Sequence, residues 1–229
     1  SNVKCNGENN GSVFLEIIGG TPPYNQNWNN INLSELSAGI YDYVIIDNNG
    51  CTFLDSITIY EPDIISVNEI ITHANCYNSN NGQAILEING GIPPYYQEWF
   101  NSNPLALNAG EHYYKVTDFN SCSFDDSIFI NQANQLIIST NIQSPICKFD
   151  SSKISFNITN PTSSFYTIEV TDEDSTYFFI IDSMGNNYIN SNSIFITPLY
   201  SKIINFISIT DENNCTSPIN IEEQVIVNE

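Results

Sequence analysis

Apolar and polar residues alternate with a period of two along most of this chain. Such alternation is typical of strands with one buried face, and it is clearest at Val13, Leu15, Ile17 and at Tyr41, Tyr43, Ile45. No stretch longer than a few residues has helical periodicity with caps. The pattern therefore predicts an all-β protein, built as a tandem array of small antiparallel Ig-like β-sandwich domains.

Glycine, proline and asparagine clusters separate the predicted strands. Residues 19–23, GGTPP, end the first strand, because prolines remove ladder donors and glycines tolerate positive φ. Residues 47–50, DNNG, predict a tight turn in which Asp47 caps its own backbone. Residues 51–59 then form the last strand of this unit.

The pattern repeats without a gap at an offset of 71 residues. GSVFLEIIGGTPPYNQNW at residues 11–28 recurs as GQAILEINGGIPPYYQEW at residues 82–99. A gapless match over so many glycines, prolines and aromatic residues indicates a tandem duplication of one folding unit.

The duplication divides the chain into a first repeat (residues 1–62), a second repeat (residues 63–133) and a divergent third segment (residues 134–229), for which we expect an Ig-like sandwich. Apolar stretches at residues 64–72 and 136–142 precede the second repeat and the third segment. The first repeat begins almost directly at its cysteine. We therefore expect an N-terminally truncated first repeat that belongs to a longer, exported array whose signal has been removed.

Each of the three parts has two cysteines. The early cysteines are Cys5, Cys76 and Cys147, and the late cysteines are Cys51, Cys122 and Cys215. Units of about 70 residues bury little core, so disulfides in an oxidising, extracellular setting are expected. If identical units fold alone they make identical internal bonds, which predicts Cys5–Cys51, Cys76–Cys122 and, by remainder, Cys147–Cys215.

Charge and hydropathy exclude two classes of partner. The chain has 26 acidic residues, five lysines and no arginine, for a net charge of −21. Such a surface repels phosphates, so nucleic acid and anionic membrane surfaces are improbable partners. No stretch approaches the 18 to 20 apolar residues of a membrane span, so membrane insertion is not expected.

Catalytic chemistry is hard to build from these residues. His112 aligns with Tyr41 on an inward strand face, which favours a buried structural role, and His73 lies between units. Trp28 and Trp99 are expected in the core rather than as exposed platforms that stack on sugars. We therefore expect a protein that is not an enzyme and has no catalytic residues and no cofactor.

Metal binding is also not expected. The six cysteines are too widely spaced for a zinc site. Hard oxygen ligands for calcium occur at Asp47 and Asn49 and at Asp118 and Asn120, but without the dense alternating carboxylates of a calcium loop. A plain turn is the favoured interpretation, with calcium the alternative.

The order of motifs resembles the SprB repeat of large surface adhesins of gliding Bacteroidetes. It runs C-N-G, G-S/Q-x-x-L-E-I-x-G-G-x-P-P-Y-x-x-x-W, A-G-x-Y/H-x-Y, D-x-N-G/S-C, over residues 3–62 and 74–132. The second copy departs from it at Tyr77-Asn78, His112 and Ser121. The resemblance implies a secreted cell-surface adhesin or gliding-motility filament, and for the third segment a generic Ig-like domain.

Exported proteins of that group also carry O-glycans on Asp-Ser/Thr followed by a small or apolar residue. Four serines fit the pattern by this resemblance, although such tripeptides also arise by chance in a chain rich in Asp and Ser: Ser56, Ser127, Ser175 and Ser183.

Two functional classes follow. In the first, the units are non-catalytic adhesive or spacer modules of a long filament, with a surface polysaccharide or protein as ligand and neighbouring repeats of the same chain as partners. In the second, they are accessory carbohydrate-binding or spacer sandwiches of a secreted polysaccharide-active enzyme. The parent reading frame discriminates them, through many further repeats or a catalytic domain.

Overall fold

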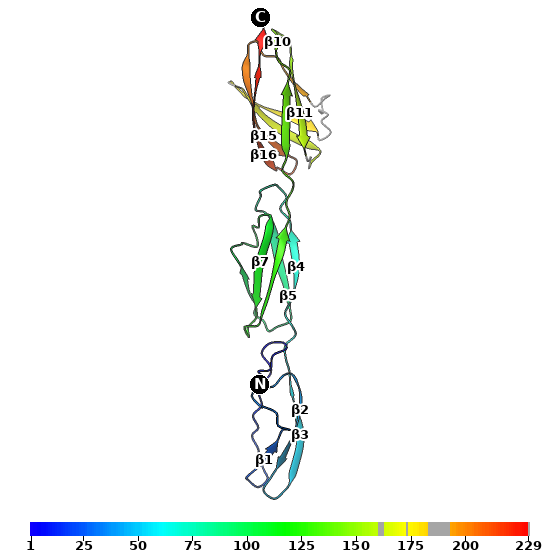
Figure 1. The fold of residues 1–229 in the computed structure, drawn as a ribbon, viewed down its shortest axis with the longest axis vertical. Coiled ribbons are helices and arrows are strands. Elements are labelled where there is room, and N and C mark those ends of the chain that lie inside the picture. Colours follow the sequence, from blue (N-terminus) through cyan, green and yellow to red (C-terminus); the bar gives the residue numbers. More distant parts are fainter. Residues whose placement is uncertain (160–162, 173, 183–192, 229) are drawn as a thin grey trace. The chain divides into compact units, whose positions relative to one another are not determined.

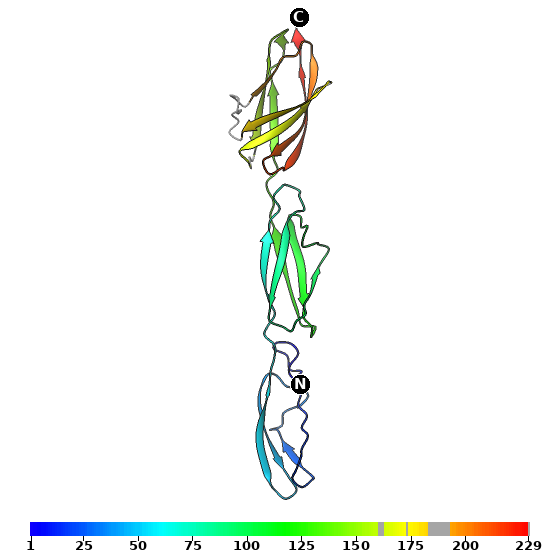
Figure 2. The same ribbon diagram turned by 180° about the vertical axis from the view of Figure 1, so that it is seen from behind.

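The structure, a computed structural model, describes residues 1–159, 163–172, 174–182 and 193–228 (Figure 1). Its regular elements are β-strands, as the two opposite views show (Figure 2). The predicted all-β fold with small antiparallel sheets is confirmed. Among the described residues no helix is long and apolar enough to cross a membrane.

The first repeat forms one antiparallel sheet of order β1-β2-β3. The strands are β1 (Asn25–Asn27), β2 (Gly39–Ile46) and β3 (Thr52–Ile59). β2 and β3 are the two strands predicted on either side of the DNNG turn, and their register pairs Ile46 with Thr52. Residues 12–18 alternate as predicted, yet they form no strand.

The second repeat contains two sheets. β4 (Ser66–Thr72) pairs with β5 (Gln83–Asn89), and a second sheet has the order β6-β7-β8. The latter strands are β6 (Tyr96–Trp99), β7 (Gly110–Thr117) and β8 (Ser123–Ile130). β5 is the copy of residues 12–18, so the same sequence is a strand here and not in the first repeat.

The third segment is a sandwich with its own core. One sheet has the order β14-β11-β9, a second has the order β13-β12-β15-β16, and β10 pairs with β17 in parallel. Phe156 of the first sheet and Phe206 of the second meet edge to face with ring centroids 5.7 Å apart. The strands are β9 (Ile137–Ile142), β10 (Ile146–Cys147), β11 (Ser152–Thr159), β12 (Phe165–Thr171), β13 (Thr176–Asp182), β14 (Ser193–Ile196), β15 (Lys202–Asp211), β16 (Thr216–Val225) and β17 (Val227–Asn228).

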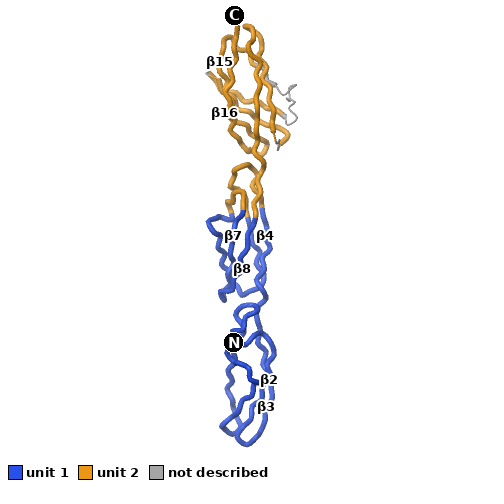
Figure 3. Tube along the Cα trace, in the orientation of Figure 1, with its two compact units in different colours: residues 1–71, 84–104, 111–128 blue, residues 72–83, 105–110, 129–229 orange. Residues whose placement is uncertain are grey.

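The chain groups into two compact units, coloured separately in Figure 3. Unit 1 consists of residues 1–71, 84–104 and 111–128, and unit 2 of residues 72–83, 105–110 and 129–229. Both units therefore draw on the second repeat. The division into three domains at residues 62 and 133 stays a prediction.

The GGTPPY motif has the same geometry in both repeats. Tyr24 donates a hydrogen bond from its hydroxyl to the carbonyl of Gly19 at 2.6 Å, and Tyr95 does the same to Gly90 at 2.6 Å. The motif thus closes a loop on itself, with both glycines at positive φ.

The tryptophans pack against tyrosines of the neighbouring strand. Trp28 is 6% exposed and stacks on Tyr43 with ring centroids 4.6 Å apart, and Trp99 lies 5.2 Å from Tyr114. The core role expected for Trp28 is confirmed, and the half-buried Trp99 packs in the same way.

Lys202 and Asp172 form a largely buried ion pair in unit 2. Lys202 on β15 donates to Asp172, whose carboxylate also accepts hydrogen bonds from the backbone N–H groups of Asp174 (3.0 Å) and Ser175 (2.9 Å). The hydrogen bond from Lys202 is the main cause that lowers the pKa of Asp172 to about 2.

This ion pair makes the free energy of unfolding of unit 2 depend on pH below about pH 4. Because the pKa of Asp172 is lower in the folded state than its ordinary value of 3.8, the pair stabilises fully above about pH 4 and is lost as the pH falls toward 2. D172N should remove about 1–2 kcal/mol of unfolding free energy at pH 7 and flatten its slope between pH 4 and pH 2. Urea unfolding at each pH measures this, with the exposed D174N as the control. Equal slopes in wild type and D172N would contradict it.

Candidate functional site

One turn with a cysteine at its end recurs three times. Asp47 accepts a hydrogen bond from the backbone N–H of Cys51 at 2.9 Å, as Asp118 does from Cys122 (2.8 Å) and Asp211 from Cys215 (2.9 Å). The aspartate, four residues before the late cysteine, therefore fixes that cysteine at the start of the last strand.

The second oxygen of this carboxylate holds the GGTPPY loop in both repeats. Asp47 accepts from the N–H of Thr21 at 3.1 Å, and Asp118 from the N–H of Ile92 at 2.9 Å. The N–H of Cys51 is the main cause that lowers the pKa of Asp47. These are the oxygens that the calcium alternative would use, and they are engaged with backbone donors as in the plain-turn interpretation.

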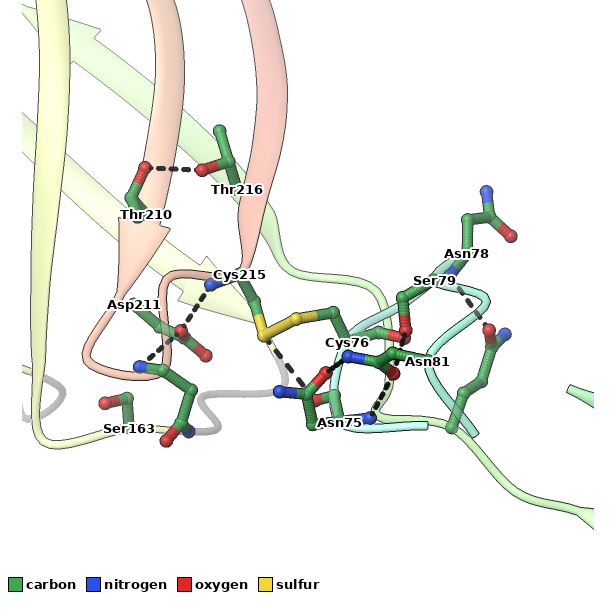
Figure 4. The surroundings of a disulfide bond; sticks show 12 residues. Asn75, Cys76, Asn78, Ser79, Asn81, Ser163, Thr210, Asp211, Cys215 and Thr216 are labelled. Atoms are coloured by element: carbon green, nitrogen blue, oxygen red, sulfur yellow. Dashed lines mark hydrogen bonds between the residues drawn. A yellow bond between two sulfur atoms is a disulfide. The ribbon is translucent and has the colours of Figure 1, made fainter. Parts of the chain in front are cut away.

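The disulfides differ from the predicted pairing. The structure bonds Cys5 to Cys122, with Cα atoms 5.6 Å apart, and Cys76 to Cys215, 5.3 Å apart (Figure 4). Cys51 and Cys147 are exposed free thiols. The predicted pairs Cys5–Cys51, Cys76–Cys122 and Cys147–Cys215 are therefore wrong, although four of the six cysteines are bonded.

Strand length explains why the first repeat cannot close its own bond. The N–H of Val3 donates to the carbonyl of Tyr60 at 2.9 Å, which places the early cysteine Cys5 beside the end of β3. Cys51 stands at the beginning of β3, and eight residues of strand span ~26 Å. A disulfide needs Cα atoms roughly 5.5 Å apart.

The third segment shows the same separation. The backbone N–H groups of Ile146 and Lys148 donate to the carbonyls of Ile226 and Asn228, so Cys147 lies beyond the end of the ten-residue strand β16. Cys215 immediately precedes β16. In the first repeat and in the third segment, the early and late cysteines therefore lie at opposite ends of the strand that follows the late cysteine, β3 or β16.

Each observed bond instead joins an early cysteine to the late cysteine of the next repeat. Around Cys5–Cys122, the side-chain amide of Asn120 donates to the carbonyl of Lys4 at 2.9 Å. Around Cys76–Cys215, the sulfur of Cys215 lies 3.5 Å from the carbonyl oxygen of Asn75. The sequence predicted that these four cysteines form disulfides, but it predicted bonds within each repeat and not bonds between neighbouring repeats.

A cavity of about 440 Å³ opens in the first repeat beside residues 12–18. Its lining includes Leu15, Ile17, Tyr43 and the free cysteine Cys51. Next to it Phe14 and Ile18 are 93% and 90% exposed.

The second repeat covers the matching surface with its own linker and β4. Tyr114, the copy of Tyr43, is 1% exposed and donates its hydroxyl to Glu69 of β4 at 2.6 Å. Burial, followed by this hydrogen bond, raises the pKa of Tyr114. Leu86, the copy of Leu15, is buried here, whereas Leu15 is half-buried. The sequence signal for this cover is the apolar stretch at residues 64–72, which precedes the second repeat.

The glycines of the GGTPPY motif are covered in the second repeat, whereas Gly19 in the first repeat is not. A Cβ atom at Gly90 would lie 1.9 Å from the carbonyl oxygen of Ile64, and one at Gly91 would lie 2.8 Å from Ile65. At Gly19, the copy of Gly90, nothing lies within 4 Å. The linker of the second repeat thus lies directly on its two glycines.

The histidines hold structural positions. His112 is 7% exposed, and its Nδ1 lies 2.8 Å from the hydroxyl of Ser102, so the expected buried role is confirmed. His73 accepts a hydrogen bond at Nδ1 from the N–H of Asn131 at 3.2 Å. Neither histidine lines the cavity in the first repeat. Among the described residues, no three His, Cys, Asp or Glu side chains gather as a metal-binding group.

The serines of the O-glycan pattern differ in solvent exposure. Ser56 on β3 and Ser175 before β13 are exposed, whereas Ser127 on β8 is half-buried and donates to Glu111 at 2.9 Å. Ser183 lies outside the described residues. Their glycosylation stays a prediction.

The two glycines provide a matched test of the linker contact. G19A and G90A each place a Cβ at positive φ, which costs about 1–2 kcal/mol, but only G90A meets the carbonyl of Ile64. G90A should therefore lower the unfolding free energy by at least ~2 kcal/mol more than G19A in urea titrations. Equal losses would show that the linker does not rest on Gly90.

The disulfide pattern predicts unequal effects for two equivalent late cysteines. C122S opens a loop with a sequence separation of 117 residues, so it should cost about 5 kcal/mol, whereas C51S should change stability little. Chemical unfolding under oxidising conditions measures both. Non-reducing peptide mapping should recover Cys5–Cys122 and Cys76–Cys215, and a Cys5–Cys51 peptide would refute the pattern.

Comparison with known families gives one finding for this chain. The family model of the SprB repeat matches residues 1–33, which include the first GGTPPY motif and the first early cysteine. No curated protein matches the chain. The match supports a SprB repeat at the start of the chain, and the likeness of the second repeat rests on the 71-residue duplication.

Proposed function

We propose that this chain serves as non-catalytic, load-bearing spacer modules of a SprB-type adhesin on the cell surface. The similarity of residues 1–33 to the SprB repeat supports a surface protein of the Bacteroidetes adhesin type. The net charge of −21 favours solubility at high local density and disfavours self-association.

The observation that carries the proposal is the overlap of the two disulfide loops. Cys5–Cys122 encloses Cys76, and Cys76–Cys215 encloses Cys122. A fully extended chain of 229 residues spans ~800 Å. With both bonds intact, the shortest covalent route between the ends runs through residues 1–5, 76–122 and 215–229, which span ~230 Å. The covalent structure therefore limits stretching, as a spacer under tension requires.

Adhesion itself is part of the proposal. A surface polysaccharide or protein is the expected ligand, and neighbouring repeats of the same chain are the expected partners. The stacking of Trp28 on Tyr43 removes one sugar platform that the accessory-domain alternative would have used. No other observation favours the accessory-domain function. A catalytic domain in the parent reading frame would favour it over the spacer function.

Pulling single molecules by their termini tests the load-bearing role. The oxidised chain should reach a contour length of ~230 Å, and C5S should reach ~310 Å because the route then runs through residues 1–76 and 215–229. C51S should match the wild type, and full reduction should release ~800 Å. An oxidised chain that extends to ~800 Å would refute the proposal.

A further inference from the structure

The core of the third segment opens at the end where β13 begins. Tyr177, Phe179 and Ile181 share one face of β13, and their cross-strand partners on β12 are all buried, so this face points into the core. Ile181 is buried and Phe179 is half-buried, but Tyr177 is 43% exposed. Among the described residues, the cover over the core therefore decreases toward the first residues of the strand.

A cavity of about 320 Å³ lies at this opening. Its most buried lining residues, Val170 and Ile204, belong to the core of the sandwich. Further lining comes from Tyr177 and Phe179 of β13, from residues 196–198 and from the ion pair described above. Ligand sites in proteins have volumes of roughly 300–1,000 Å³, so this cavity suits a ligand of one or two sugar rings in size.

The ion pair at the cavity offers donors and no acceptor. Both oxygens of Asp172 are engaged, one by the backbone N–H groups of Asp174 and Ser175. The other oxygen accepts from Lys202 and from the hydroxyl of Tyr177 at 3.3 Å. An ammonium has three N–H donors, and among the described residues Asp172 is the acceptor of Lys202. The ammonium, on a side chain that is 20% exposed, therefore has N–H groups left for a ligand.

Charge favours a neutral ligand at this cavity. Lys202 and Asp172 together carry no net charge, and the whole chain carries −21. An anionic ligand would be repelled by the chain without an unpaired cation at the cavity to offset the repulsion. A cationic ligand would meet a carboxylate whose oxygens already accept hydrogen bonds. The cavity therefore favours a neutral molecule that carries acceptor oxygens.

The aromatic wall adds a shape requirement. The rings of Tyr177 and Phe179 lie side by side with centroids 6.3 Å apart and planes inclined by 26°, so they form a nearly flat apolar surface. An aromatic face packs well against a flat apolar surface of a ligand. A sugar ring has such a surface in its C–H bonds, and its oxygen atoms lie around the edge, where Lys202 can donate to them.

We propose that this cavity binds one neutral hexose residue of a polysaccharide. Tyr177 packs on the C–H face of the sugar ring, and Lys202 donates to its oxygen atoms. The inference rests on the adhesive part of the proposed function, which allows a polysaccharide or a protein, and it names the polysaccharide and a site for it. The load-bearing role is separate, because no disulfide cysteine lines the cavity.

Titration of the full, oxidised chain with methyl glycosides of glucose, galactose and mannose tests the site. The backbone amide NMR signals of residues 170–172, 177–179, 196–198 and 202–204 should shift with at least one of them, with a Kd of ~1–10 mM for so small a ligand. Methyl glucuronide, which is anionic, should bind at least ~tenfold more weakly. No shift of these signals with any neutral hexoside, or tightest binding of the glucuronide, would overturn the proposal.

Two neighbouring aromatic residues of β13 provide matched variants. Tyr177 and Phe178 are both exposed, but of the two only Tyr177 lines the cavity. Y177L keeps an apolar side chain and removes the aromatic face, so it should raise the Kd at least ~fivefold, whereas F178L should leave it unchanged. Y177F keeps the ring and should retain most of the affinity. Equal Kd values for Y177L and the wild type would overturn the role of the ring.

A protein side chain is the competing occupant of the same cavity, and N-acetyltyrosinamide is the probe for it. This compound should not shift the amide signals of the lining residues. Shifts with it and with none of the hexosides would overturn the proposal in favour of a protein partner. Hexoside shifts confined to other residues would overturn this site and leave the adhesive part of the proposed function standing, and the pulling experiment does not depend on either result.

Discussion

The length of one strand constrains the rest of this structure. In the first repeat and in the third segment, the strand that follows the late cysteine, β3 or β16, separates it from the early cysteine. Its eight or ten extended residues are several times longer than a disulfide can reach. The cross-link therefore passes to the adjacent repeat. Each disulfide therefore joins neighbouring parts of the chain, and the first repeat has no internal disulfide.

The sequence was sufficient for the fold class because local and global signals agree. The alternation at Tyr41, Tyr43 and Ile45 and the turn at Asp47 predict the β2–β3 hairpin, and the structure contains it. The turn predicted at Asp47 is present, and the structure repeats its hydrogen bond to the late cysteine at Asp118 and Asp211.

The cysteine partners could not be predicted in the same way. A tandem duplication requires every repeat to make the same bond, but a bond within each repeat and a bond from each repeat to the next satisfy that symmetry equally. Only the end of β3 at which Cys5 lies decides between them, and that depends on the pairing of Val3 with Tyr60. Likewise, residues 12–18 have the sequence of β5 without its ladder, because a strand needs hydrogen-bonding partners as well as alternation.

The overlap of the two loops also bears on damage by proteases. A single cut anywhere between Cys5 and Cys215 falls inside at least one closed loop, so the two pieces stay covalently joined. Two separate cuts, or one cut and one reduced bond, are needed before material can be lost from that interval. This covalent redundancy preserves the connection between the two ends of the chain after the first break.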